Sequence, residues 1–192
     1  MELMLRCALP DRPGALAQLA TAISDVGGDI QAVDVVEHRD GRALDDLEIV
    51  LAEEHVPALL AQVSSLEGVD VVHAGPSRGV SGDAVTRLSI AIVALLDGTA
   101  EARSGVCTLI GGMLRARSAE LVAQAQAPNG DRRVLILDVG DEVLVLRRDY
   151  RFTATERERA QALLQIARRA GNGRAAAADT DSATGNLRRS PR

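Results

Sequence analysis

An aspartate on each side of the first predicted helix gives the chain its clearest candidate for binding chemistry. Asp11 precedes Pro13 and Gly14, which turn the chain sharply into the helix, and Asp29 follows the glycine pair that ends it. The turn leaves the first amides of the helix without acceptors, and these amides together with the helix dipole can hold a carboxylate. Carboxylate oxygens of Asp11 and Asp29 can hold an ammonium group. Together these groups suit the α-carboxylate and α-amine of an amino acid.

The same residues also fit a purely structural role. Pro13 and Gly14 make a good helix start without any ligand, and Asp29 can stabilise the turn into the next strand. A domain that only dimerises is therefore the alternative to a small-molecule site.

Apolar patterns predict six elements around these residues. They are a strand at 2–9, a helix, strands at 29–38 and 44–51, a helix at 54–66 and a strand at 69–74. The first helix is expected to bury one face, formed by Leu16, Leu19, Ala20 and Ile23. This order is the βαββαβ arrangement of ferredoxin-like domains.

The hydrophobic pattern also predicts how strands 29–38 and 44–51 pair. Pairing His38 with Leu44 makes one face apolar, with Val35 opposite Leu47 and Val33 opposite Ile49. The other face then has Asp34 opposite Glu48 and Val36 opposite Asp46.

The segment Leu9-Pro10-Asp11-Arg12-Pro13-Gly14-Ala15-Leu16, followed by Val26-Gly27-Gly28-Asp29-Ile30, resembles the ACT domain family. The family pattern is a strand, then D/N-x-P-G-x-L, a helix, and G-x-N/D-I opening the second strand, and the resemblance covers about residues 1–75. It implies a ligand held between two ACT domains, where edge strands pair. The ligand-binding residues that it implies are Asp11, Arg12, Pro13, Gly14, Asp29 and Ile30. Family members that bind amino acids often carry Asn where this chain has Asp11 and Asp29.

Residues 83–170 predict a second, small α+β domain with two helices, three antiparallel strands and a closing helix. The helical stripes are Val85, Leu88, Ile92 and Leu95, and then Val106, Leu109, Ile110, Met113 and Leu114. Strands are expected at 118–126, 132–139 and 142–148, with hairpin turns at 128–131 and 140–141. Thr153 and Glu156 predict a capping box for the closing helix, whose apolar face is formed by Leu163, Leu164 and Ala167.

The end of this domain, from Glu142 through Phe152 to Glu156 and an amphipathic helix, resembles the close of a GAF domain. The portion that builds that family's ligand pocket is missing, so the resemblance implies a reduced domain with a packing or dimerising role. An unrelated α+β domain is the alternative. Residues 76–82, rich in Gly and Ser, are expected to be a linker, and residues 171–192 a disordered tail.

Charge is divided unevenly along the chain. Residues 1–76 hold 14 acids and 4 arginines, whereas residues 77–170 hold 11 acids and 14 arginines. So acidic a first half disfavours nucleic acid as a partner, and it could attract the second half or a basic protein. Asp34, Asp46 and Glu48 form an acidic cluster on the outer face of the predicted sheet. A solvated face, or docking of the arginine-rich second half, is favoured over a divalent cation there.

The sequence contains no nucleophile motif, phosphate-binding loop or metal-ligand spacing. His38, His55 and His73 are expected on loops or at the surface, and Cys7 and Cys107 as buried thiols. No signal peptide is recognised, and the longest apolar run, Leu88–Leu96, is too short to cross a membrane. All basic residues are arginines, which is typical of GC-rich bacterial coding.

These observations predict a cytoplasmic, non-catalytic regulatory protein that needs no cofactor or metal. The expected ligand is an amino acid or similar small metabolite, bound by a homodimer that signals to an unidentified protein partner. Neither nucleic acid nor membrane is expected to bind. The alternative is a ligand-free scaffold for dimerisation and protein contact.

Overall fold

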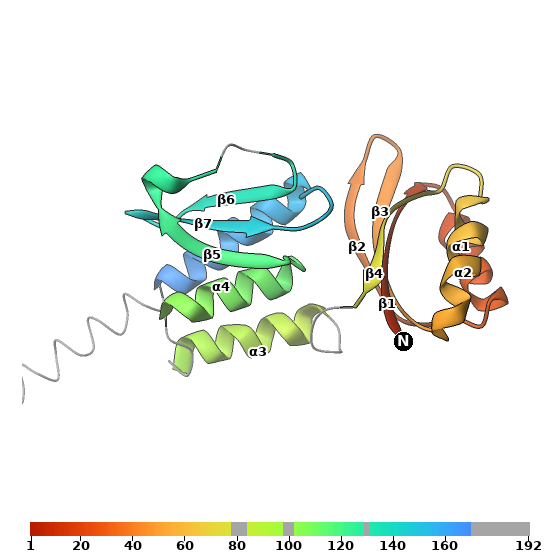
Figure 1. The fold of residues 1–192 in the computed structure, drawn as a ribbon, viewed down its shortest axis with the longest axis horizontal. Coiled ribbons are helices and arrows are strands. Elements are labelled where there is room, and N and C mark those ends of the chain that lie inside the picture. Colours follow the sequence, from red (N-terminus) through yellow and green to blue (C-terminus); the bar gives the residue numbers. More distant parts are fainter. Residues whose placement is uncertain (78–83, 98–101, 129–130, 170–192) are drawn as a thin grey trace, which may run out of the picture.

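The chain forms two α+β halves, each with one antiparallel sheet and its own apolar core (Figure 1). The computed structural model describes residues 1–77, 84–97, 102–128 and 131–169. We call residues 1–77 the first half and residues 84–169 the second half. The predicted tail (171–192) and most of the predicted linker (76–82) lie outside the described residues.

The first half is a βαββαβ unit, as the apolar patterns predict. Its elements are β1 (Glu2–Pro10), α1 (Ala15–Asp25), β2 (Asp29–Arg39), β3 (Arg42–Val50), η1 (Glu53–His55), α2 (Val56–Ser64) and β4 (Asp70–Pro76). The strands pair antiparallel in the order β2-β3-β1-β4, so β2 and β4 are the edge strands. This order confirms the ferredoxin-like fold.

Helices α1 and α2 cover one face of this sheet and enclose the first core (Figure 1). On α1 the buried side chains are Ala15, Leu19, Ala22 and Ile23, which recur at helical spacing. Leu16 was expected on this face, but it is 40% exposed. The prediction for Leu16 is wrong because the buried face of α1 is centred on Leu19 and Ile23, and Leu16 lies to one side of it.

The predicted pairing of β2 with β3 is wrong by one to two residues. Asp34 lies opposite Asp46, rather than Glu48, and Val33 lies opposite Leu47. The cause is a pair of irregularities in β2, one between Ile30 and Ala32 and one between Val35 and Glu37. Each places an extra residue in β2, which shifts the register and can turn a side chain to the other face.

Gly28, which follows α1, is required for close packing. A Cβ at Gly28 would lie 2.7 Å from the side chain of Ile23 and 3.2 Å from that of Ile49. The predicted end of the helix is confirmed, because the amides of Gly27 and Gly28 donate to the carbonyls of Ser24 and Ile23.

The second half contains two helices, a three-stranded sheet and a closing helix at residues 154–169. Its elements are α3 (Ala84–Asp97), α4 (Ala102–Met113), β5 (Ser118–Ala123), η2 (Gln124–Gln126), β6 (Val134–Asp138) and β7 (Glu142–Arg147). The second core confirms the predicted stripe on α4, because Val106, Ile110 and Leu114 are buried in it. On α3, Leu88 packs against this core, but Val85 is 71% exposed, contrary to the prediction.

The strands of the second sheet are ordered β5-β7-β6. The hairpin at residues 140–141 is confirmed, since β6 pairs with β7. The hairpin expected at 128–131 is wrong, because β5 pairs with β7 and the connection must pass to the far edge of the sheet. The strand expected at 118–126 is also shorter, because β5 ends at Ala123 and residues 124–126 form η2. Turn chemistry does not determine which strand is the neighbour.

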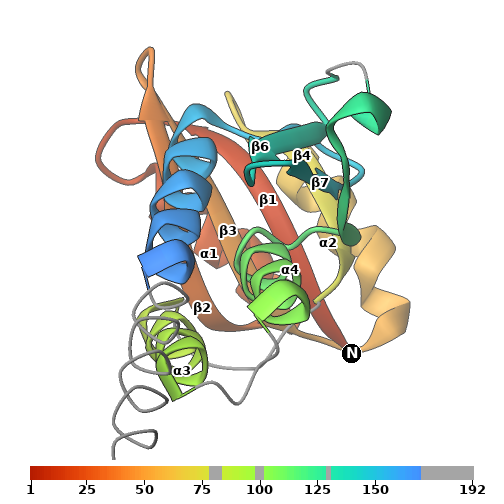
Figure 2. The same cartoon turned by 90° about the vertical axis from the view of Figure 1, so that its left-hand side faces the viewer.

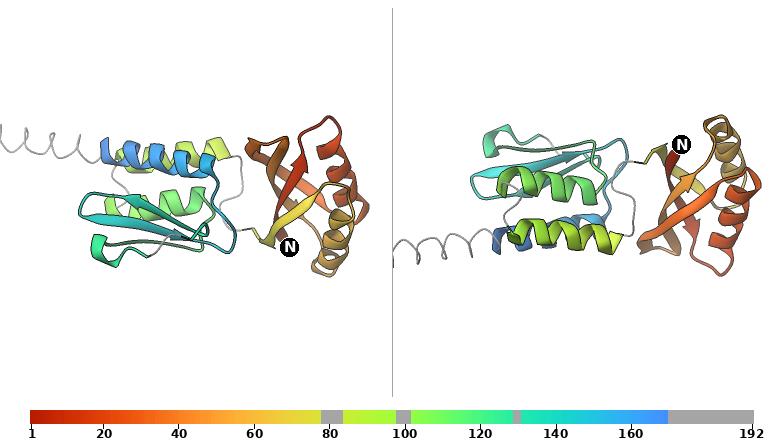
Figure 3. Two further views of the ribbon diagram at one scale, coloured as in Figure 1. Left: turned by 90° about the horizontal axis from the view of Figure 1, so that it is seen from above. Right: turned by 90° about the horizontal axis from the view of Figure 1, so that it is seen from below.

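The second half packs against the face of the first sheet that α1 and α2 leave free. Figure 3 shows the four-stranded sheet between the two helices and the second half in both views. Viewed from the second half, α4 and the closing helix lie in front of the sheet (Figure 2). Met4 and Arg6, on this face of β1, are consequently buried. We call this contact between the two halves the seam.

Candidate functional site

The turn from β1 into α1 has the free amides that the sequence predicts. Gly14 has a φ of +88°, a left-handed conformation that favours glycine. The amides of Gly14, Leu16 and Ala17 have no backbone acceptor among the described residues. Asp11 is exposed, and its Oδ2 lies 3.3 Å from Nδ1 of His38 on β2. The turn thus offers donors for an anion, with an exposed carboxylate three residues before Gly14.

Asp29 lies at the opposite end of the sheet from Asp11. It pairs with Val50, which pairs with Glu2 at the start of β1, whereas Asp11 follows the end of β1. The helix between them has 11 residues, which corresponds to a separation of about 16 Å. A single chain therefore does not bring together the two carboxylates that were expected to hold an ammonium group.

The residues next to Asp29 give it a local partner. Its Oδ2 accepts a hydrogen bond of 2.5 Å from Nε2 of Gln31, while Ile30 is half-buried against the first core. At the other end, Arg12 is exposed, and its side chain has no ion pair among the described residues.

Asp45 was missed by the sequence analysis. It lies on β3 opposite Cys7 and Val35, is 2% exposed, and its Oδ1 has no hydrogen-bond partner among the described residues. Burial raises the pKa of Asp45, the charge of His38 opposes this rise, and Asp11 is among the acids that add to it. Asp45 therefore lies in the same acidic region as Asp11. The sequence did carry a signal, since adjacent Asp45 and Asp46 must point to opposite faces of a strand.

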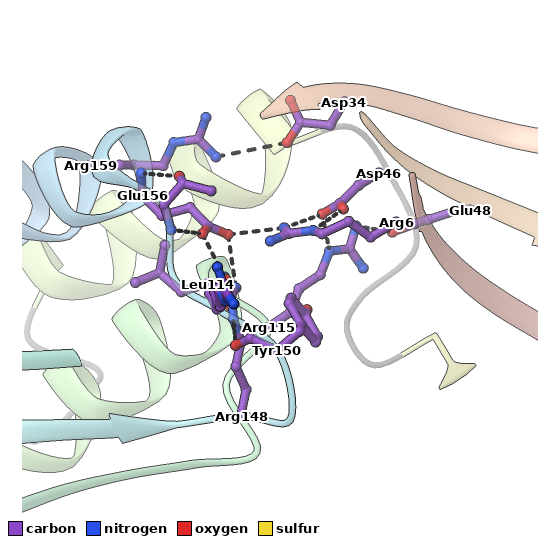
Figure 4. A network of polar contacts seen from close by, with 12 residues as sticks. Arg6, Asp34, Asp46, Glu48, Leu114, Arg115, Arg148, Tyr150, Glu156 and Arg159 are labelled. Carbon is purple, nitrogen blue, oxygen red and sulfur yellow. Dashed lines mark hydrogen bonds and ion pairs between the residues drawn. The ribbon is translucent and has the colours of Figure 1, made fainter. Parts of the chain in front are cut away.

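Four charged side chains form a buried network across the seam (Figure 4). Arg6 donates from Nε to Oδ1 of Asp46 at 2.6 Å and from Nη2 to Oε1 of Glu156 at 2.9 Å. Arg148 donates from Nη1 and Nη2 to the two oxygens of Glu156, at 2.8 and 2.5 Å. We call Arg6, Asp46, Arg148 and Glu156 the seam network. It links the central strand of the first sheet to the closing helix.

Glu156 connects this network to the start of the closing helix. Its Oε2 accepts from the amide of Thr153 at 2.8 Å, and Thr153 Oγ1 accepts from the amide of Glu156 at 3.1 Å. The predicted capping box is therefore confirmed. Burial on its own would raise the pKa of Glu156, but the hydrogen bonds and charges of Arg148 and Arg6 outweigh burial and lower it to about 2. The carboxylate is thus held in its charged form.

Tyr150 lies within the seam between two guanidinium groups. Its ring centroid is 4.6 Å from Cζ of Arg6 and 4.1 Å from Cζ of Arg148, within the range of cation–π attraction. The ring also contacts that of His73 on β4, at 4.4 Å between centroids. His73 is thus in a strand facing the seam and not on a loop, and burial lowers its pKa.

The acidic cluster on the sheet docks the arginine-rich second half, one of the two roles favoured from the sequence. Arg115 lies 2.8 Å from Glu48 and 3.5 Å from Asp46, and Arg159 lies 3.8 Å from Asp34. Because of the irregularity in β2, Val36 also faces the seam, next to Met113 and Leu114. Arginine nitrogens thus occupy the positions that a cation would take, and no group of three metal-ligating side chains exists among the described residues.

Arg115 follows α4 in an unusual backbone conformation. Its φ is +51°, and the amide of Ala116 donates to the carbonyl of Gly111 at 2.8 Å, which is the closing bond of a glycine-type helix end. Arginine is strained at this position, where glycine is usual. The side chain that glycine lacks is the one that reaches Asp46 and Glu48.

The two cysteines lie in different cores, and neither forms a disulfide. Burial raises the pKa of Cys7 to about 12, and the charges of Asp45 and Asp46 act in the same direction. Cys107 is only half-buried, against the prediction, and packs on the second core. None of the described helices is long and apolar enough to cross a membrane.

Comparison with known proteins identifies the first half. Residues 3–68 match the family model of the ACT domain, so this part of the chain is an ACT domain, as the resemblance in the sequence predicts. None of the curated proteins compared with the chain matches it.

Several solved structures are similar to the chain at low identity. The regulatory subunit of aspartate kinase from Thermus thermophilus, in its ligand-free form, is 11% identical with a TM-score of 0.37, covering 88% of this chain and 91% of that one. The same subunit from Thermus flavus is 15% identical with a TM-score of 0.35, covering 88% and 92%. An uncharacterized protein from Thermotoga maritima is 20% identical with a TM-score of 0.33, covering 40% and 96%.

Proposed function

We propose that this chain is a non-catalytic regulatory protein whose ACT domain binds an amino acid between two copies and signals to a partner protein in trans. The observation that carries the proposal is that Asp11 and Asp29 lie beside opposite ends of one edge strand, β2. Asp11 contacts His38 near the end of β2, and Asp29 begins β2. If the β2 strands of two copies pair antiparallel, the start of one strand lies beside the end of the other. Asp29 of one copy then lies near Asp11 of its partner.

Strand β2 has the properties of an edge strand that pairs with a strand of another chain. It is 11 residues long, and Val33 and Val35 on its helix-covered side are 42% and 44% exposed. A long edge strand with exposed apolar side chains tends to pair with another chain. Such pairing supports a homodimer.

The groups that this pairing brings together from the two copies match the charged groups of an amino acid. The free amides at the start of α1, with Arg12 beside them, suit the α-carboxylate. Asp11, the unpartnered oxygen of Asp45 and Asp29 of the second copy suit the α-ammonium. A buried carboxylate oxygen without a partner is costly, so an ammonium near Asp45 would add to the affinity.

The first prediction concerns the ligand. Thermal unfolding of the wild-type chain, followed by dye fluorescence against the twenty amino acids, is expected to shift upward for one or two of them, because they bind the folded state. Replacing Asp11→Ala is expected to weaken that shift at least ten-fold in ligand concentration. Asp141→Ala, an exposed aspartate on the β6–β7 turn, is the matched control. A wild-type response that Asp11→Ala leaves unchanged contradicts the site.

The second prediction concerns the dimer. Val35→Lys places a charge on the exposed edge, which should prevent two β2 strands from pairing. Sedimentation is expected to show a dimer for the wild type and a folded monomer for the variant, together with loss of the amino-acid response. A wild-type monomer, or a dimer that survives Val35→Lys, rules out pairing through β2.

The alternative is a scaffold without a ligand. Its support is that both carboxylates have partners within one chain, Asp11 at His38 and Asp29 at Gln31. A dimer that shows no response to any amino acid would favour this role. We further propose that residues 1–75 and 83–170 are the two domains, joined by a linker at 76–82. In this proposal the second is a small GAF-like α+β domain with a packing or dimerising role.

A further inference from the structure

A pocket opens at the seam on the side of β4, away from Asp11 and Asp29. It has a volume of about 240 Å³, which is smaller than the roughly 300–1,000 Å³ of pockets that take drug-sized ligands. Its walls come from both halves, with His73, Gly75 and Pro76 on one side and Arg115, Arg117 and Tyr150 on the other. A molecule bound there would touch both halves at once.

The charge that lines the pocket is positive. Three arginines, Arg115, Arg117 and Arg148, line it with a single acid, Asp149. Glu156 neutralises Arg148, and Arg115 is shared between Asp46 and Glu48, but Arg117 has only a loose partner. Its Nη1 lies 3.5 Å from Asp149, and both side chains are more than half exposed. Exposed pairs of this kind contribute about 0–1 kcal/mol, so a ligand carboxylate can replace Asp149 at little cost.

Gly75 keeps the pocket open. Its φ is not in the left-handed region, so its backbone conformation does not require glycine. It lies opposite Met4, which also lines the pocket, and therefore faces the seam. A Cβ at this position would lie 3.1 Å from Nε2 of His73. Glycine inside a strand weakens the strand and often marks a place where a ligand approaches closely.

Polar groups without partners face the same region. The His73 ring makes no hydrogen bond to the described residues, and the Tyr150 hydroxyl is buried without a partner. Nε and Nη2 of Arg117 are likewise free of protein acceptors in the part of the chain that the structure describes. Two parallel N–H donors of a guanidinium fit the two oxygens of a carboxylate.

We propose that this pocket is a second ligand site, specific for a small carboxylate, with Arg117 as its anchor and Gly75 as the space for the body of the ligand. The site is independent of the proposed amino-acid site and stands if that site fails. Because the ligand contacts both halves, it stabilises the arrangement in which they are packed together.

The test is calorimetric titration of the full chain with acetate, succinate and citrate, at ionic strength matched with chloride. At least one of these carboxylates is expected to bind saturably. Arg117→Gln removes the anchor, and Gly75→Leu fills the space, so each is expected to weaken binding at least ten-fold. Arg157→Gln, an exposed arginine on the closing helix, is the matched control and should bind as the wild type does.

Three results would overturn the proposal. They are no saturable binding of any of the three carboxylates, binding that neither Arg117→Gln nor Gly75→Leu weakens, and equal binding of phosphate and sulfate, which would remove the carboxylate specificity. If Gly75→Leu fails to fold, Arg117→Gln decides alone, because the exposed Arg117 is not needed for packing. Unchanged amino-acid shifts in Arg117→Gln would distinguish this site from the one at Asp11.

Discussion

Glu156 has three roles at the scale of a single residue. It caps the closing helix, pairs with Arg148, and reaches Arg6 of the first half, all through one buried carboxylate. Removing one partner of a buried ion pair leaves the other charges unpaired, which costs about 3–5 kcal/mol. The fold of the seam therefore depends on the charge of this group more than on any exposed ion pair.

The pH dependence of stability follows from the same group. The pKa of Glu156 is about 2 in the folded chain and near 4.5 when unfolded. A depressed carboxyl pKa contributes stability that is complete above the unfolded value and is lost as the pH falls toward the folded value. The free energy of unfolding, measured in urea, is thus expected to fall by on the order of 3 kcal/mol between pH 5 and 2 on account of this group.

Glu156→Gln tests this assignment because an amide keeps the cap and removes the titration. The variant is expected to be about 3–5 kcal/mol less stable at pH 7 and to lose less stability on acidification than the wild type. Parallel pH profiles for the two proteins would show that other carboxylates account for the acid sensitivity.

At the scale of elements, α4 ends in a strained backbone conformation that allows a contact with the first half. Arg115 occupies the left-handed position at which glycine is usual, and its side chain crosses the seam to Glu48. Arg115→Gly and Arg115→Ala both remove that contact, but only glycine relieves the backbone. Arg115→Gly is therefore expected to be about 1 kcal/mol more stable than Arg115→Ala, measured by urea unfolding. Equal stabilities would mean that the helix end rearranges in both variants.

The elements themselves were largely predictable from the sequence, whereas their neighbours were not. Apolar periodicity located the strands and helices of both halves, and Thr153 with Glu156 marked the start of the closing helix. The predicted register of β2 and β3 was wrong because the alternation of apolar and polar residues does not reveal an irregularity near Val36. The predicted neighbour of β5 was wrong for a related reason, since the turn residues at 128–131 do not determine which strand pairs with β5. The seam network was not predicted, because no sequence pattern indicates that Arg6 meets Glu156, which lies 150 residues further along the chain.

At the scale of the whole molecule, the two halves are held by complementary charge. Asp34 and Asp46 lie directly opposite each other on β2 and β3, a pairing that is unfavourable in an isolated sheet. Arginines from the second half offset this repulsion, with Arg159 near Asp34 and Arg115 near Asp46. The acidic first half and the arginine-rich second half therefore attract each other within one chain.

This arrangement predicts how the chain unfolds. In the wild type, the two halves are expected to melt in one calorimetric transition, because each covers a face of the other that carries buried charge. The combined variant Asp34→Asn, Asp46→Asn, Glu48→Gln keeps the shapes but removes the attraction. It leaves Arg115 without its two carboxylates and Arg6 with Glu156 alone. It is expected to melt in two transitions, the first at a lower temperature than that of the wild type. Asp131→Asn, Asp138→Asn, Asp141→Asn removes the same amount of charge away from the seam and should keep a single transition. A single transition in the seam variant would show that apolar contacts, such as those of Met4 and Val36, are enough to couple the halves.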